Sequence, residues 1–200
     1  TDKAVSPINL YCATKLAMEK LLVAANGYAG TRKTVFSVVR YGNVVGSRGS
    51  VIPIYLKLAA EGKKEMPVTD ERMTRFWITL EEGVELVLHA LDAAVGGEIY
   101  IPHIPSMKIT DLAKAICPDC SIKVIGIRPG EKIHERLVSE EEGRNTVFYE
   151  YNGRKGYIIL PQYIFESSKK DKFSSFEKVP EGFEYRSDTN DWWLNQDELA

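Results

Sequence analysis

The segment INLYCATKLAMEKLLVAA, residues 8–25, followed by TVFSVVR, residues 34–40, decides the fold class. In the first segment Leu10, Thr14, Ala17, Leu21 and Ala24 recur at intervals of three and four, which predicts a helix with one continuous stripe. The second segment is rich in β-branched residues and predicts a buried strand. A helix that leads into a buried strand is typical of an α/β protein.

The rest of the chain repeats this alternation of helices and strands. We predict further helices over 52–61, 81–94, 110–116 (with Thr110 as N-cap) and 131–138. Strands are predicted over 67–69, 98–101 and 122–125, with loops over 41–50 and 70–76. The turn pair Asn152-Gly153, between 149–151 and 157–160, indicates a hairpin. The polar stretch 166–178 predicts a surface loop.

The composition of the 200-residue chain is that of a globular protein and gives no support for a nucleic-acid-binding or membrane protein. Hydrophobic residues make up 44% and charged residues 27%, as in ordinary globular proteins. A net charge of -2 gives no electrostatic reason to expect nucleic acid or a membrane surface as partner. The apolar runs are too short to span a bilayer, and the first residues do not form a signal peptide. We therefore expect a cytoplasmic protein.

The three cysteines cannot form a fully paired disulfide framework, and they suit a reducing compartment. Cys117-Pro-Asp-Cys120 lacks the second Cys/His pair that a zinc site needs. A redox-active motif of this kind opens a helix, whereas this one follows a predicted helix. We predict no metal site and no redox role for the pair.

Tyr11 and Lys15 are the first candidates for chemistry. Four residues apart on a helix, they lie on one face. A nearby ammonium group favours the phenolate form of a tyrosine, so such a pair can take a proton from a hydroxyl group. The spacing alone is weak, because two solvent-facing side chains would show it equally well.

Neighbouring blocks strengthen this interpretation. The run from Thr1-Asp2-Lys3 through Pro7 and Asn9 to Tyr11 and Lys15 closely resembles the active-site segment of extended short-chain dehydrogenases. Within that family, Asp-Lys is similar to the dipeptide of inverting UDP-N-acetylglucosamine 4,6-dehydratases. The resemblance continues in three later blocks, RYGNVVGSRGS (40–50), TDERMTRFWIT (69–79) and IRPGEKIHE (127–135).

The resemblance implies a reaction and a role for each residue of the first block. Such enzymes oxidise C4 of the sugar with NADP, remove the C5 proton, expel the 6-hydroxyl as water and return the hydride to C6. Asp2 would be the acid, Lys3 the C5 base, Tyr11 the base for the C4 hydroxyl, and Lys15 its partner and a ribose ligand. Thr1 would bind substrate near C4.

The later blocks imply contacts with substrate and cofactor. Arg75 and Arg128 would bind the diphosphate, since arginine forks suit phosphate oxygens. Glu131 would accept hydrogen bonds from ribose hydroxyls. Asn43 would meet the substrate at the end of the strand over 34–40, and the loop with Tyr41 and Asn43 would also touch the nicotinamide.

The resemblance also predicts the organisation of the chain. Residues 1–50 would hold the last helix and strand of a Rossmann-like dinucleotide-binding domain, 51–140 a small α/β substrate-binding region, and 141–200 a hairpin and tail. No glycine-rich phosphate fingerprint occurs, so the N-terminal dinucleotide-binding strands are expected to be absent. We expect these 200 residues alone to be incomplete for turnover, and the whole enzyme to be a dimer or hexamer.

Three functions stay open at this point. The leading one is inverting dehydration of UDP-N-acetylglucosamine, which in the family begins pathways to pseudaminic acid and related bacterial surface-glycan sugars. A sugar-nucleotide epimerase would use the same Tyr–Lys pair without needing Asp2 and Lys3. An inactive fragment would bind UDP-sugar through Arg75 and Arg128 without turnover.

Overall fold

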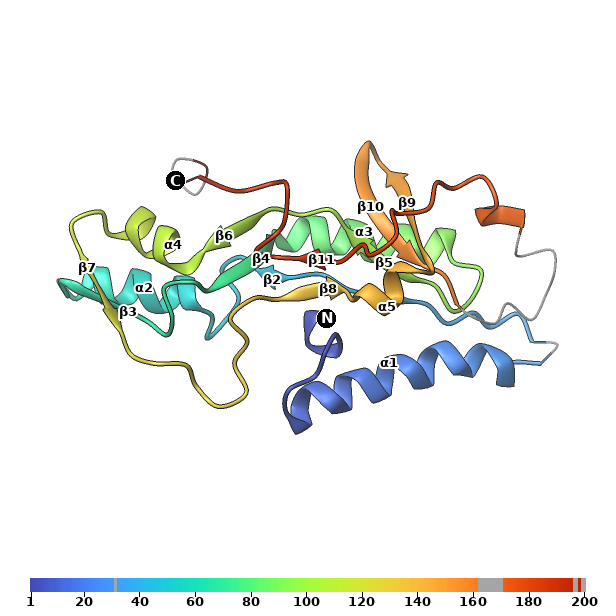
Figure 1. Ribbon diagram of the computed structural model, residues 1–200, viewed down its shortest axis with the longest axis horizontal. Coiled ribbons are helices and arrows are strands. Elements are labelled where there is room, and N and C mark those ends of the chain that lie inside the picture. The colour runs from blue at the N-terminus through green and yellow to red at the C-terminus, as the bar shows by residue number, and fades with distance from the viewer. Residues whose placement is uncertain (31, 162–170, 196–197, 199–200) are drawn as a thin grey trace. The chain divides into compact units, whose positions relative to one another are not determined.

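The computed structural model describes residues 1–30, 32–161, 171–195 and 198, and it shows an α/β protein (Figure 1). The chain divides into two compact units, each assembled from three stretches of sequence. The first unit comprises Thr1–Tyr41, Glu81–His103 and Arg136–Tyr185. The second comprises Gly42–Leu80, Ile104–Glu135 and Arg186–Ala200. The domain division at residues 50 and 140 stays a prediction.

A four-stranded sheet organises the first unit, in the order β1 (Val38–Val39), β5 (Ile99–Pro102), β10 (Arg154–Ile159), β9 (Thr146–Tyr151). β1 runs parallel to β5, and β10 is antiparallel to both β5 and β9. The predicted hairpin is confirmed: Asn152 and Gly153 between β9 and β10 both have positive φ, at 49° and 75°. Two left-handed residues match the right-handed twist of paired strands.

The core of the first unit is aromatic. It is formed by side chains of the sheet and of helix α3 (Leu80–Ala93), with Tyr100, Tyr149 and Tyr151 beside Leu86 and Ile158. Helix α1 (Leu10–Tyr28) confirms the predicted helix over 8–25 and runs slightly further. The unit also holds η1 (Asp2–Ala4), β8 (Arg136–Val138), α5 (Glu140–Gly143) and η2 (Asp171–Phe173). Strand β11 (Tyr185–Arg186) begins at Tyr185, the last residue of the first unit, and ends at Arg186, which belongs to the second unit.

The buried strand predicted over 34–40 is much shorter in the structure. Only Val38–Val39 pairs as β1. The Asn26 side chain accepts from Phe36 N and donates to Phe36 O, both at 2.9 Å. Phe36 O also accepts from Gly97 N at 2.8 Å, so the carbonyl group of Phe36 still reaches the segment before β5, while Phe36 N is bound to the Asn26 side chain.

The described residues of the second unit include two small sheets and two α-helices. One sheet has the order β2 (Asn43–Val44), β4 (Thr74–Ile78), β6 (Ser106–Lys108), and the other pairs β3 (Glu65–Val68) with β7 (Ser121–Val124). The helices are α2 (Val51–Ala60) and α4 (Ile109–Ile116). Tyr55, Met66, Trp77, Met107 and Leu112 form its core.

Three predictions in the second unit's sequence were wrong. Residues 74–76 belong to the buried strand β4 and not to a loop. Residues 131–138 form no helix, because the carbonyl groups of Ile133 and Glu135 accept from Thr74 N and Ser187 N, which removes them from helical bonding. Lys108 and not Thr110 occupies the N-cap of α4. The predicted loop over 166–178 lies partly outside the described residues, and within the described part Phe173 is buried.

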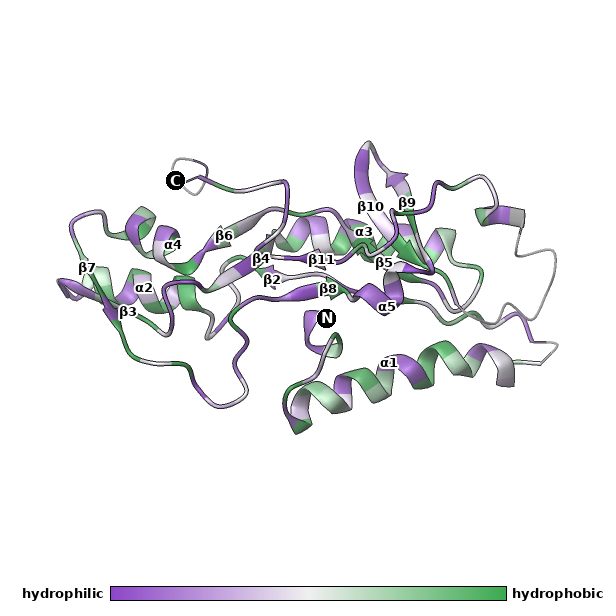
Figure 2. Cartoon of the chain, viewed as in Figure 1, coloured by the Kyte–Doolittle hydropathy of each residue, from purple (hydrophilic) through white to green (hydrophobic). Residues whose placement is uncertain are grey.

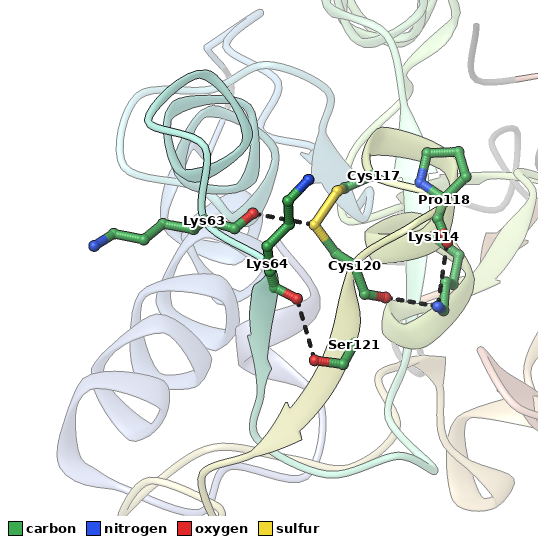
Figure 3. Close-up of a disulfide and its surroundings, with 7 residues drawn as sticks. All are labelled: Lys63, Lys64, Lys114, Cys117, Pro118, Cys120 and Ser121. Carbon is green, nitrogen blue, oxygen red and sulfur yellow. Dashed lines mark hydrogen bonds between the residues drawn. A yellow bond between two sulfur atoms is a disulfide. The ribbon is translucent and has the colours of Figure 1, made fainter.

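A disulfide closes the end of α4 (Figure 3). Cys117 and Cys120 are joined across a turn in which Cys120 N donates to Cys117 O at 3.1 Å. Lys114, one turn earlier, donates to Cys120 O at 2.6 Å and Pro118 O at 3.3 Å. This disulfide was not predicted from the sequence, whereas Cys12 is free and buried, so the three cysteines are not fully paired. Within the described ranges, no helix is long and apolar enough to cross a membrane.

Candidate active site

Thr1, Asp2 and Lys3 form one hydrogen-bonded group at the start of the first unit. Lys3 Nζ donates to Asp2 Oδ2 at 2.9 Å, and Thr1 Oγ1 donates to Asp2 Oδ1 at 3.3 Å. Thr1 Oγ1 also accepts from Lys3 N at 3.3 Å, which caps the short helix η1. The Asp2 side chain is only 6% exposed, while that of Lys3 is 36% exposed. A buried carboxylate is thus joined to an ammonium group that solvent can reach.

Helix α1 brings Tyr11 and Lys15 together. Asn9 caps the helix by accepting from Cys12 N at 2.8 Å, which places Tyr11 in the first turn. Lys15 Nζ lies 5.4 Å from the centre of the Tyr11 ring, and the tyrosine is 60% exposed. Because α1 packs against η1, all five residues predicted for the first block lie on two adjacent elements.

α1 is held by polar anchors more than by an apolar face. Figure 2 shows apolar residues along the helix, yet Leu10, Met18 and Leu21 are exposed. Among its residues only Cys12 and Glu19 are buried. The position of Tyr11 and Lys15 therefore depends strongly on what Glu19 binds.

Glu19 binds Arg40, a fully buried residue that the sequence analysis did not single out. Arg40 Nε and Nη2 donate to the two carboxylate oxygens of Glu19, at 2.7 and 2.5 Å. Its Nη1 and Nη2 donate to both oxygens of Glu142, at 2.8 and 2.7 Å, and Nη1 also donates to Leu137 O at 2.9 Å. The sequence offered one sign of this network: Glu19 is an acidic residue four positions after Lys15 on the same predicted helix.

Opposing effects act on the charges of this network. Burial alone would lower the pKa of Arg40, but the hydrogen bonds and charges of Glu142 and Glu19 outweigh it and raise that pKa above its ordinary value. Burial alone would raise the pKa of Glu142, but Arg40 outweighs it and holds that pKa below the ordinary value. Arg40 and Glu142 therefore stay charged in the folded protein.

The predicted cofactor-loop residues fall into different units. Tyr41 ends the first stretch of the first unit, where it packs against the aromatic core. Asn43 lies in β2 of the second unit, in register with Trp77 of β4. Between them, Gly42 approaches β4 so closely that an added Cβ would lie 2.5 Å from the Phe76 Cβ. The loop can therefore take this path only with glycine at position 42.

Arg128 and Glu131 form a turn on the second unit. Glu131 N donates to Arg128 O at 3.1 Å, and the Glu131 carboxylate accepts from Arg128 N at 3.3 Å. Arg128 is exposed and Glu131 is half-buried. Both predicted substrate contacts are thus brought together on one accessible turn.

Arg75 is buried instead. Its Nη1 donates to Thr74 O at 2.7 Å and to Ile133 O at 3.0 Å, and its Nη2 donates to Lys132 O at 2.9 Å. Its Nε lies 3.7 Å from Glu135 Oε1. The guanidinium predicted to bind diphosphate therefore donates several of its hydrogen bonds to main-chain carbonyl groups inside the protein.

A polar cluster that the sequence analysis missed surrounds Arg75. Thr74 Oγ1 lies 2.9 Å from His134 Nδ1 and 2.6 Å from Ser187 Oγ, and Glu135 N donates to Ser187 Oγ at 2.9 Å. Burial lowers the pKa of His134, which favours its neutral form. The cluster joins β4, the 132–135 segment and the segment at Ser187.

The comparison with known proteins places these residues in a family context. The family model described as polysaccharide biosynthesis protein matches residues 1–154. A UDP-N-acetylglucosamine 4,6-dehydratase (inverting) from Campylobacter jejuni subsp. jejuni serotype O:2 is 54% identical over 205 residues, which cover 100% of this chain and 60% of that protein. The chain thus spans about 60% of the length of this curated relative.

Solved structures show the same fold. Pen from Bacillus thuringiensis is 32% identical, with a TM-score of 0.80 over 99% of this chain and 58% of that one. DesIV, a dTDP-glucose 4,6-dehydratase from Streptomyces venezuelae with NAD bound, is 19% identical, with a TM-score of 0.57 over 80% of this chain and 48% of that one. The predicted fold, part of an extended short-chain dehydrogenase fold, is confirmed.

Proposed function

The chain belongs to the polysaccharide biosynthesis protein family, and we propose that the protein carrying it is an inverting 4,6-dehydratase of UDP-N-acetylglucosamine. The observation that carries this proposal is the ion pair between Lys3 and the buried Asp2, at 2.9 Å, on an element packed against the helix of Tyr11 and Lys15. The 54% identity to the Campylobacter jejuni dehydratase supports the same assignment.

The Asp2–Lys3 pair can supply an acid and a base at once. Moving one proton from Lys3 Nζ to Asp2 Oδ2 leaves a neutral amine and a neutral carboxylic acid, with no change in net charge. We propose that the Lys3 amine then takes the C5 proton, while Asp2 gives its proton to the departing 6-hydroxyl, which leaves as water. Both groups return to their starting charge, so the elimination is balanced.

Tyr11 and Lys15 are proposed to prepare the substrate for that elimination. Tyr11 takes the proton of the C4 hydroxyl, and the ammonium of Lys15 stabilises the phenolate. Both side chains are accessible and close together, which fits a nicotinamide cofactor and its ribose beside them. When bound, that cofactor supplies the transient oxidation at C4 and the return of the same hydrogen to C6. Thr1 is proposed to bind substrate near C4, while Tyr41 and Asn43 approach the cofactor.

The second unit is proposed to hold the nucleotide. Arg128 offers an exposed guanidinium for the diphosphate, and Glu131 offers carboxylate oxygens for ribose hydroxyls. Asn43 is proposed to contact substrate as well as cofactor. The direct diphosphate contact of Arg75 stays a prediction. In this structure its guanidinium is buried and donates to main-chain carbonyl groups.

Finer points of the proposal rest on the family resemblance. We propose NADP as the nicotinamide cofactor, a cytoplasmic enzyme that assembles as a dimer or hexamer, and a product used for bacterial surface-glycan or flagellin sugars of the pseudaminic acid type. Activity with NADP compared with NAD tests the choice of cofactor. The mass of the full-length protein in solution tests whether it assembles as a dimer or hexamer.

Replacing Lys3 separates the dehydratase from an epimerase. In the full-length protein, we expect Lys3→Ala to slow loss of the C5 proton by about 10²–10⁴-fold, because no other base is proposed for it. UDP affinity should not change, since the nucleotide contacts lie elsewhere. Lys33→Ala, at an exposed lysine of the same unit, is the matched control.

An epimerase needs no acid–base pair at this position. If Lys3→Ala converted UDP-sugar at the wild-type rate, the result would favour the epimerase and contradict the assignment of Lys3 as the C5 base. UDP binding without any turnover in the wild-type protein would favour a chain that only binds UDP-sugar.

A further inference from the structure

We propose that the Cys117–Cys120 disulfide is a thiol-exchange site that reacts preferentially with small thiols carrying a net negative charge. The disulfide closes the end of α4 in the second unit, and the proposed dehydratase chemistry uses neither cysteine. Low-molecular-weight thiols are the reagents that keep cysteines reduced in reducing compartments. The proposal replaces the sequence-based expectation that this pair has no redox role.

The two cysteines differ in accessibility. Cys117 is half-buried and forms the C-cap of α4, whereas Cys120 is only 1% exposed. Pro118 and Asp119, which lie between them, are both exposed. An attacking thiolate that approaches from this exposed turn therefore meets Cys117 Sγ first, and Cys120 is the sulfur that leaves.

The surroundings of Cys120 suit its reduced form. Figure 3 shows the main-chain carbonyl of Lys63 facing Cys120, and Lys63 O lies 3.3 Å from Cys120 Sγ. A disulfide sulfur carries no proton and cannot donate to this carbonyl, whereas a thiol can. Ser121 N donates to Lys64 O at 2.9 Å and holds the next residue against the segment before β3. The structure therefore already offers an acceptor for the thiol that reduction releases.

The exchange is balanced in two steps. A thiolate attacks Cys117 Sγ, the bond between the two cysteine sulfurs breaks, and Cys120 leaves as a thiolate that takes up a proton. A second thiolate then attacks the reagent's sulfur in the mixed disulfide and releases Cys117, so the reagent becomes a disulfide. The protein gains two electrons and two protons, all of them supplied by the two thiols.

Positive charge around the disulfide favours an anionic reagent. Lys114 Nζ donates to Cys120 O at 2.6 Å, so its ammonium group lies at the turn itself. Lys63 and Lys64 approach Cys120 and Ser121 through their carbonyl groups, and both lysines are exposed. At low salt, charges at this range act on a reagent that approaches the sulfur.

The acidic residues nearby offset this charge only in part. Glu65 lies 3.1 Å from Lys123, and Glu61 lies 3.9 Å from Lys57, so both carboxylates are next to a lysine of their own. Asp119 is the acidic residue of the turn. Together with Lys57, segments 61–65 and 114–123 therefore carry a net positive charge.

The site is a target of exchange and not a catalyst of it. Cys117 lies at the C-terminus of α4, where the helix dipole disfavours a thiolate. Redox catalysts with two cysteines at this spacing instead place the attacking cysteine at a helix N-terminus, which favours the thiolate. We therefore expect the pair to accept electrons from small thiols without passing them to other proteins.

Three thiols of similar size and different charge test the proposal on the full-length protein, prepared without reductant. They are mercaptopropionate (negative), mercaptoethanol (neutral) and cysteamine (positive). Mass spectrometry of the peptide that contains both cysteines follows loss of the disulfide, and each rate is divided by the same thiol's rate with a neutral small-molecule disulfide. We expect the negative thiol to react about three- to tenfold faster than the positive one at low salt.

Salt and surface variants show whether charge causes this preference. The ratio of the two rates should approach one at about 1 M salt, where the Debye length is about 3 Å. Lys63→Gln combined with Lys64→Gln should at least halve the ratio at low salt. Lys108→Gln is the matched control, because Lys108 is an exposed lysine at the other end of α4, and it should keep the wild-type ratio. If the double variant does not fold, the salt series on the wild-type protein decides.

Single-cysteine variants test which sulfur is attacked. Cys120→Ser leaves the half-buried Cys117, and Cys117→Ser leaves the buried Cys120. Each thiol is treated with the disulfide of mercaptopropionate, which gives a mixed disulfide and one free mercaptopropionate. We expect Cys117 to react several-fold faster than Cys120, because access limits exchange at a buried sulfur.

Two results would overturn the proposal. One is equal normalised rates for the three thiols at low salt, and the other is faster reaction at Cys120 than at Cys117. A peptide that carries two free thiols in protein prepared without reductant would also overturn it. These readouts do not depend on turnover, so loss of the proposed dehydratase function would leave this inference standing.

Discussion

Arg40 and Arg75 show how one kind of side chain can serve two structural purposes when it is buried. Arg40 is fully buried and donates to both oxygens of two carboxylates. Arg75 donates to main-chain carbonyls. Both uses follow from a planar group with several donors in fixed directions. The sequence did not single out Arg40, because residue types alone do not show whether a guanidinium is buried; the phosphate role of Arg75 stays a prediction.

At the same scale, Gly42 is required by close packing. In Gly42→Ala the new methyl would lie 2.5 Å from Phe76 Cβ and 2.7 Å from Phe76 O, so the backbone must shift. We expect a loss of about 1–3 kcal/mol in the free energy of unfolding, as for an overpacked core. Thermal unfolding of the full-length protein measures it.

Gly83 offers the matched control for that substitution. It lies in helix α3, and an added Cβ would meet no heavy atom within 4 Å. Gly83→Ala should be neutral or stabilise the protein by up to about 1 kcal/mol, because alanine favours a helix. If Gly42→Ala were as stable as wild type, the close approach of the loop to β4 would be wrong.

Among the elements, α1 depends on the Arg40 network for its position. Arg40→Met would leave Glu19 and Glu142 buried without their main partner, and we expect it to cost about 3–5 kcal/mol at pH 7. Lys20→Met is the control, because Lys20 also approaches both glutamates but is 55% exposed. It should cost no more than about 1 kcal/mol. Equal costs for the two variants would contradict the network's role.

The same network predicts a pH dependence. Arg40 holds the pKa of Glu142 below its ordinary value, so the folded state binds fewer protons than the unfolded state. The resulting stability is complete above the unfolded-state pKa of about 4.3 and is lost as the pH falls through the lower folded-state pKa. Urea unfolding should show the gap between wild type and Arg40→Met narrowing below about pH 4. A gap that is independent of pH would count against this assignment.

The elements also show which sequence signals were sufficient. The stripe of α1, the Asn152-Gly153 turn and the helices α2 and α3 were predictable, because each is determined by residues near one another in the chain. The strand β4 and the irregular 132–135 segment were not, because their polar residues are satisfied by distant partners such as Ser187. Local polarity therefore suggested a loop where long-range hydrogen bonds form a buried strand.

For the whole molecule, each unit combines stretches that are far apart in sequence. Residues 81–103 and 136–185 belong with the N-terminal stretch, and residues 186–200 belong with the second unit. The domains predicted from the sequence are continuous stretches, because composition does not show that the chain passes back and forth between two units. The pairings of candidate residues could be predicted: Asp2 with Lys3, Tyr11 with Lys15 and Arg128 with Glu131 each come together in the structure, while their roles stay predictions.

We propose that this chain carries the acid–base residues of an inverting dehydratase. Proton NMR of the full-length protein with UDP-N-acetylglucosamine and NADP in deuterated water tests it most directly. We predict a new C6 methyl signal, deuterium at C5 and inverted configuration at C5. An unchanged substrate spectrum, or a product altered only at C4 with hydrogen retained at C5, would contradict the account.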